Sequence, residues 1–94
     1  MRVERELSTN FGERVVLFIE QPEKSNRENE FSCRIGLLGA GLDASTRIYG
    51  IDPMQALLLS IRHLSGFVEK HSTSMHPNRL VWELGRGETD FGLL

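Results

Sequence analysis

The sequence predicts an α+β fold with the element order β-β-β-β-α-β: an antiparallel β-meander of about four strands, one long helix packed on one face of it, and one further C-terminal strand. Two observations predict this class. Residues 50–57 (GIDPMQAL) carry the signals of a helix start, and the segments before them alternate or run apolar in short stretches, which is typical of strands. The 94 residues form a single domain, 1–94.

The start of the helix is the most specific of these signals. Asp52 can accept hydrogen bonds from free N–H groups of the first turn, Pro53 suits the first helical position, and Gln55 can reach back to the cap backbone. We expect the helix to span about 53–71. Its predicted core face is a stripe with three flanking residues: Leu57, Ile61, Leu64 and Val68, flanked by Met54, Leu58 and Phe67.

The first two predicted strands differ in character. Residues 3–7 carry charges on both faces, which favours an edge strand, and residues 15–19 are apolar on both faces, which favours a central strand that Pro22 ends. A central strand of this kind requires a cover on both sheet faces, either from a curled sheet or from a partner. A turn at 10–12, a polar loop at 23–30, a break at 39–43 and strands at 31–38, 46–49 and 80–84 complete the prediction, with the pairing of the last strand left open.

Composition restricts the partners that we expect. The net charge of −2 argues against general nucleic-acid binding, which needs a basic surplus. The sequence contains no apolar run of the ~20 residues that span a bilayer, and residues 1–6 lack the apolar region of a signal peptide. With a single cysteine, the chain has no internal disulfide. We therefore expect a cytoplasmic protein that binds neither nucleic acid nor membrane.

No group of residues forms a catalytic signature. The glycine-rich segment 36–41 precedes a β pattern and not a helix, so it indicates a hairpin loop and not a phosphate loop. His63, His71 and His76 do not have the spacing of a zinc site. Cys33 alternates with apolar neighbours, which indicates a buried residue. The sequence thus predicts no catalytic residue, no metal site and no cofactor.

One part of the predicted helix is a candidate interface. Leu59 lies about 160° from Ile61 by the helical period, on the predicted outer side, with Ala56, His63 and Gly66. Gly66 costs the helix about 1 kcal/mol relative to alanine and permits close backbone approach. Leu59, His63 and Gly66 are therefore a candidate surface for a homodimer or a partner, against the alternative of one exposed leucine without a role.

A second candidate is a polar site. It would lie between the helix start and the glycine-rich C-terminal segment, and its residues are Asp52, Gln55, Trp82 and Asp90. Each also has a simpler explanation: a cap for Asp52, a core position for Trp82, and a turn for Asp90.

Several short motifs resemble a family of small bacterial proteins known as a domain of unknown function. They are CRIG at 33–36, the GIDPMQAL block at 50–57, the Trp-Glu pair at 82–83, and Gly87 with DFGL at 90–93. The resemblance implies a bacterial source and a compact α+β domain. It implies no activity, cofactor or catalytic residue.

These observations lead to three functional hypotheses. The first is a non-enzymatic protein-interaction module of a bacterial cytoplasmic protein, one form of which is an immunity-type protein that blocks a toxin. The alternative is a small-molecule binder or weak enzyme with the polar site described above. The third is a subunit of a homo-oligomer, joined through Leu59 and Gly66.

Overall fold

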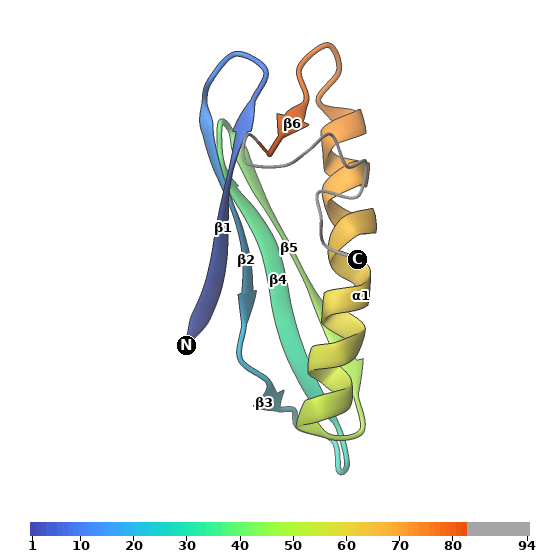
Figure 1. Cartoon of the computed structure of the whole chain (residues 1–94). Coiled ribbons are helices and arrows are strands. Elements are labelled where there is room, and N and C mark those ends of the chain that lie inside the picture. The colour runs from blue at the N-terminus through green and yellow to red at the C-terminus, as the bar shows by residue number, and fades with distance from the viewer. Residues whose placement is uncertain (83–94) are drawn as a thin grey trace.

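The structure is a computed structural model that describes residues 1–82 (Figure 1). The described part is an antiparallel sheet with one long helix packed on one face, which confirms the α+β class. In chain order the elements are β1 (Arg2–Thr9), β2 (Arg14–Glu20), β3 (Glu23–Lys24), β4 (Phe31–Gly39), β5 (Leu42–Gly50), α1 (Pro53–Ser74) and β6 (Leu80–Val81).

The sheet has the spatial order β5-β4-β2-β1-β6, and every pairing is antiparallel. β2 is central, as predicted, and β1 pairs on its other side only with β6, through Ser8↔Val81 and Thr9↔Leu80. The pairing of the last strand is therefore with β1. The end of that predicted strand, residues 83 and 84, lies outside the described residues.

β3 lies within the segment that the sequence predicts to be a loop, and it continues β2 along the same edge of β4. Between the pairs Ile19↔Ile35 and Glu23↔Ser32, residues 20–22 face only residues 33–34 of β4. The segment that joins β2 to β3 therefore has one residue more than the facing part of β4, as in a β-bulge. Pro22 accounts for the interruption because it has no N–H to donate to β4.

The hairpin of β4 and β5 is longer than predicted. The expected break at 39–43 is a two-residue turn in which Ala40 (φ 51°) and Gly41 (φ 82°) both have positive φ. Such a turn matches the twist of the flanking strands. Pairing then runs without interruption from Gly39↔Leu42 to Phe31↔Gly50. The predicted strand at 46–49 is therefore only the second half of β5, and residues 43–45 gave no strand signal because little is buried there.

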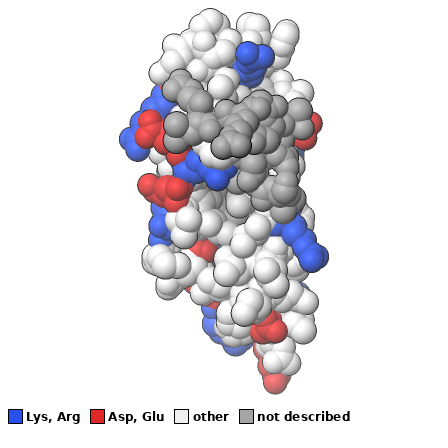
Figure 2. Space-filling model, in the orientation of Figure 1, with Lys and Arg blue, Asp and Glu red and all other residues white. Residues whose placement is uncertain are grey.

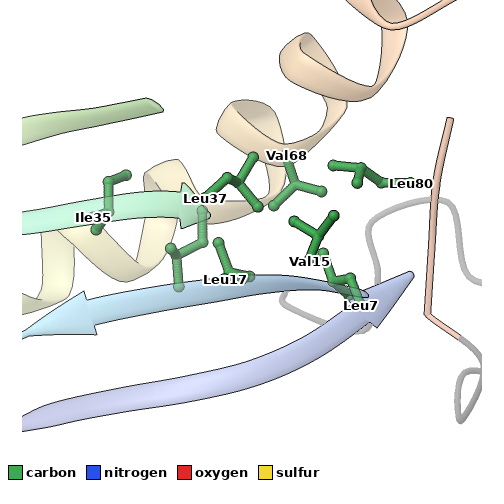
Figure 3. Close-up of a cluster of buried hydrophobic side chains, with 8 residues drawn as sticks. Leu7, Val15, Leu17, Ile35, Leu37, Val68 and Leu80 are labelled. Atoms are coloured by element: carbon green, nitrogen blue, oxygen red, sulfur yellow. The ribbon is translucent and has the colours of Figure 1, made fainter. Parts of the chain in front are cut away.

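The core lies between α1 and the sheet. α1 contacts β4 and β5. Figure 3 shows side chains from the strands gathered between β1, β2 and the helix. The cluster comprises Leu7, Val15, Leu17, Ile35, Leu37, Leu64, Val68 and Leu80.

The helix is rotated relative to the sequence prediction. Its buried residues are Ala56, Ser60, Leu64 and Val68, not the stripe centred on Ile61. The prediction was wrong for Ile61, whose exposed fraction is 37%, and also for the two flanking residues Leu58 and Met54, with exposed fractions of 49% and 66%.

Small residues cause this rotation. An added Cβ at Gly50 would lie 2.9 Å from the Cα of Ala56, so the first turns of α1 rest almost directly on the end of β5. Ser60 is fully buried beside Cys33, and its hydroxyl donates to the Ala56 carbonyl at 2.7 Å. Where the first turns of α1 approach the sheet this closely, the inner face has room only for small side chains such as Ala56 and Ser60, and the larger Ile61 turns outward.

The second sheet face is covered by the protein's own side chains around Phe18. This ring is only 1% exposed, because Gly36 on β4 leaves space for it: an added Cβ there would lie 2.3 Å from the ring. The guanidinium carbons of Arg2 and Arg34 lie 4.0 Å and 5.2 Å from the ring centroid. The Glu20 carboxylate holds both guanidinium groups, at 2.8 Å and 3.5 Å. At this position the sheet therefore needs no partner to cover it.

The rotation of α1 predicts unequal effects of two substitutions. Leu64→Ala should lower the free energy of unfolding by about 2–5 kcal/mol, because the side chain is buried in the core. Ile61→Ala should cost less, about 1 kcal/mol, because more than a third of that residue's surface is already exposed, against 8% for Leu64. Urea unfolding followed by circular dichroism measures both. A larger loss at Ile61 than at Leu64 would contradict the rotation.

The Glu20 pair predicts a pH-dependent effect. The hydrogen bond from Arg2 lowers the pKa of Glu20 below its ordinary value of 4.5; burial opposes this shift, and the charge of Arg34 adds to it. A lowered pKa means that the ionised carboxylate stabilises the fold fully above pH 4.5, and that this contribution is lost as the pH falls through the lowered value. Urea unfolding of wild type and Glu20→Gln should therefore differ at pH 7 and converge towards pH 3. An equal difference at both pH values would disprove the role of the charge.

Candidate functional site

The helix start forms as the sequence predicts. The Asp52 carboxylate accepts a hydrogen bond from the N–H of Gln55 at 2.7 Å, and Pro53 occupies the first helical position. The Gln55 side chain accepts from the N–H of Ile51 at 2.9 Å, one residue before the cap. Asp52 and Gln55, two residues of the candidate polar site, are therefore both engaged in capping.

A shallow groove lies on the outer side of the same turns. Its volume is about 310 Å³. The groove presents the Arg62 guanidinium beside two leucines and a methionine, and this arrangement suits binding more than acid–base chemistry. Its walls are Asp52, Met54, Gln55, Leu58, Leu59 and Arg62.

Trp82, a third residue of the predicted polar site, lies away from the helix start. Trp82 directly follows β6, which lies at the opposite end of α1 from the helix start (Figure 1). The Arg5 guanidinium carbon stacks 3.9 Å from the centroid of its ring. Asp90 lies outside the described residues. The described part of the chain thus joins Asp52 to Gln55 and separates them from Trp82.

The residues of the candidate interface lie on one flank of α1, which we call the interface flank: Leu59, His63 and Gly66. Leu59 is half-buried, and His63 is exposed with its Nδ1 atom 2.8 Å from the Leu59 carbonyl oxygen. An added Cβ at Gly66 would meet nothing within 4 Å. Ala56, which the sequence places on the same outer side, is instead fully buried. Among residues 1–82, no contact at Gly66 explains the glycine.

A second surface carries the exposed apolar residues of α1. Met54, Leu58 and Ile61 recur at helical spacing, with exposed fractions of 66%, 49% and 37%, and Ile51 before the cap is 65% exposed. We call these four residues the apolar stripe. Uncharged atoms cover most of the surface over the lower half of α1 in Figure 2.

A small hollow opens between Leu64 of α1 and the sheet. α1 lies over β4 and β5, so it leaves part of the inner face of β1 and β2 beside the helix and not beneath it. The hollow has a volume of about 130 Å³. We call it the β1–β2 hollow, and its lining is Val3, Glu4, Arg5, Leu17, Phe18, Ile19 and Leu64.

Cys33 is in the wrong environment for a nucleophile. The side chain is fully buried against α1. Burial raises the pKa of the thiol above its ordinary value, and hydrogen bonding to Ser60 offsets only part of that shift. The thiol is therefore protonated at neutral pH, whereas nucleophilic attack needs the thiolate.

Metal-ligating side chains are not clustered in the part of the chain that the structure describes. Within residues 1–82, no three His, Cys, Asp or Glu side chains are close enough to share an ion. His71 instead packs edge-on against Phe67 in the last turns of α1, with ring centroids 4.7 Å apart. Over the same residues, no helix has the length and apolar character to cross a membrane.

The fold and its surfaces define a class: a small α+β domain in which one helix covers part of an antiparallel sheet, with exposed apolar residues on that helix and no cluster of metal-ligating side chains among residues 1–82. A comparison with protein families matches residues 3–93 to a domain of unknown function (DUF6968), and the chain belongs to that family. No curated protein and no solved structure matched the chain.

The sequence prediction missed two surfaces, the apolar stripe and the free edge of β5. A signal for the stripe was present: Ala56 and Ser60 stand four residues apart and follow Gly50, which indicates a close helix–sheet contact. The β5 edge had a weaker signal, because its polar residues 43–47 do not form an apolar alternation.

Proposed function

We propose that this protein is a non-enzymatic protein-interaction module whose partner docks on the apolar stripe. The observation that carries the proposal is the exposure of Ile51, Met54, Leu58 and Ile61 beside one another at the start of a stable, capped helix. Exposed apolar patches on small domains mark interaction surfaces, since burying them on a partner releases ordered water.

The β1–β2 hollow extends this surface. By the helical period, Ile61 lies on the same side of α1 as Leu64, which borders the hollow together with Val3 and Ile19. An apolar side chain of a partner that enters the hollow while its neighbours cover the stripe would act as an anchor, the usual organisation of a binding hot spot.

The chemistry of the polar groups favours binding over catalysis. The side chains of Asp52 and Gln55 accept hydrogen bonds from backbone N–H groups at the helix start, and Cys33 is buried and protonated. The alternative, a small-molecule site in the groove at the helix start, is supported by the volume of the groove and by Arg62. The apolar stripe has more exposed apolar surface than a small polar ligand would use, and this favours a protein partner.

We also propose where the protein acts, which is the cytoplasm of a bacterium. One form of the proposed function is an immunity-type role, in which the module binds and blocks a toxin. The net charge of −2 is compatible with a partner whose surface is basic. This form rests on analogy with other small acidic domains.

Site-specific cross-linking tests the proposal. A photo-reactive residue at position 58, introduced in the cells that make the protein, should capture a different protein, because Leu58 lies at the centre of the apolar stripe. The same residue at Phe11, a large hydrophobic position in the β1–β2 turn that is even more exposed than Leu58 (70% against 49%), is the control and should capture nothing specific. With the captured partner purified, Leu58→Glu should weaken binding at least about tenfold and Phe11→Glu should leave it unchanged.

Two results would contradict the proposal. One is cross-linking at position 58 that does not exceed that at position 11. The other is a purified partner that binds Leu58→Glu as well as it binds wild type. Circular dichroism of both variants checks that neither loss comes from unfolding.

A further inference from the structure

The outer edge of β5 is a long, regular strand edge without a pairing strand in the described part of the chain. β5 pairs with β4 along all nine residues and with no other described strand. Such an edge is a template for another strand, and proteins usually block it with proline, charged side chains (lysine above all) or a bulge. β5 contains no proline or lysine, its register with β4 is unbroken, and its two charged residues, Asp43 and Arg47, have opposite signs.

The turn defines which groups of β5 face outward. In a two-residue turn the N–H of Leu42 points to the carbonyl of Gly39, so Leu42 and every second residue after it point their backbone groups towards β4. The N–H and carbonyl groups of Asp43, Ser45 and Arg47 therefore point away from the sheet. They are available to pair with a strand from another molecule.

The side chains of β5 are complementary to a second copy of β5. In an antiparallel pair with Ser45 opposite Ser45 of the other copy, Asp43 lies directly opposite Arg47 on the open face of the sheet. The Asp43 side chain is exposed and makes no ion pair within residues 1–82, and Arg47 has only a distant one, 3.9 Å from Glu23.

The helix-side face of the same register is complementary too. Leu42 lies opposite Ile48, and Ala44 opposite Thr46, so apolar and small side chains meet there. A shift by two residues would place Asp43 opposite Ser45 or Tyr49 and lose the charge pairing. The register around Ser45 is therefore the one that the side chains favour.

The position of α1 is compatible with this pairing. Strands in a sheet are about 4.8 Å apart, and α1 contacts both β4 and β5, so a two-fold axis beside β5 would bring the two helix axes to about 10 Å from each other. Packed helices have interaxial distances of about 8–10 Å. The sheets and the helices of two copies can therefore meet at the same time.

Gly66 then gains a physical role. By the helical period, the interface flank lies on the side of Ala56, which contacts Gly50 of β5. Ser45, which lies on the proposed two-fold axis, is about 16 Å along β5 from Gly50. Ala56 lies beside Gly50, and α1 rises about 16 Å in about 11 residues from there. The two-fold axis therefore passes close to Gly66. A glycine at this crossing lets two helix backbones approach, whereas the monomer leaves open space there.

We propose that two copies of this chain form a two-fold dimer in which their β5 strands pair antiparallel around Ser45 and their α1 helices meet at Gly66. The two sheets become one continuous sheet, with both helices on the same face. The proposal does not depend on the proposed partner, which uses the apolar stripe on the other flank of α1.

The test is the solution mass of the purified full chain by light scattering over a concentration series. Wild type should reach twice the 10.7 kDa chain mass. Asp43→Lys should raise the dissociation constant at least about tenfold, since it places two cations opposite each other in both symmetric pairs. Combining Asp43→Lys with Arg47→Asp restores opposite charges and should restore the dimer.

Three control variants make the result specific. Glu28→Lys makes the same charge change in an exposed loop and should dimerise like wild type. Leu58→Glu alters the apolar stripe and should also dimerise like wild type, which separates this proposal from the proposed function. Gly66→Leu should weaken the dimer while leaving the monomer folded, because leucine favours helix and an added Cβ at this position meets nothing within 4 Å among residues 1–82.

Three outcomes would overturn the proposal. They are a wild-type protein that stays monomeric up to its solubility limit, an Asp43→Lys variant that dimerises as tightly as wild type, and a double charge exchange that fails to recover the dimer while circular dichroism shows a native fold.

Discussion

The close contact between the start of α1 and the end of β5 determines most of what this structure presents to solvent. Gly50 has no side chain, so Ala56 rests on its backbone, and Ser60 follows on the same side beside Cys33. This contact fixes the rotation of the helix about its axis. The rotation buries Leu64 and Val68, exposes the apolar stripe, and places the interface flank towards the free edge of β5. The two proposed surfaces are thus two consequences of one packing constraint.

Different groups cover the two faces of the sheet. On the inner face, α1 covers β4 and β5 and leaves the β1–β2 hollow beside it. On the outer face, Arg2 and Arg34 lie over Phe18, and Glu20 holds both guanidinium groups in place. A sheet that covers this face with its own side chains has less need of a partner there. Within residues 1–82, the apolar stripe and the β5 edge remain without a partner, and membership of a domain-of-unknown-function family assigns neither a role.

Local signals in the sequence predicted much of the fold. The cap of Asp52 and Pro53 placed the helix start correctly, and residues 15–19, apolar on both faces, correctly indicated the central strand β2. The helix rotation was mispredicted because the prediction placed the stripe of large apolar residues against the sheet. In the structure, the small residues Gly50 and Ala56 allow a close contact, and this contact determines which side of the helix faces the sheet. The length of β5 was underestimated because pairing with β4, and not burial, holds its polar residues in the sheet. The sequence could not show that Trp82 lies far from Asp52 and Gln55, because this depends on the pairing of β6, which the sequence left open.

The most direct test of this account is a nuclear Overhauser spectrum of the protein in solution, which reports hydrogen atoms closer than about 5 Å without any substitution. The account predicts cross-peaks between the Ala56 methyl group and the α-hydrogens of Gly50, and between the β-hydrogens of Ser60 and Cys33. It also predicts that the Ile61 methyl groups give no cross-peak to Cys33. Strong Ile61–Cys33 cross-peaks, with none between Ala56 and Gly50, would show that the helix presents its large apolar residues to the sheet, and both proposed surfaces would then be wrongly placed.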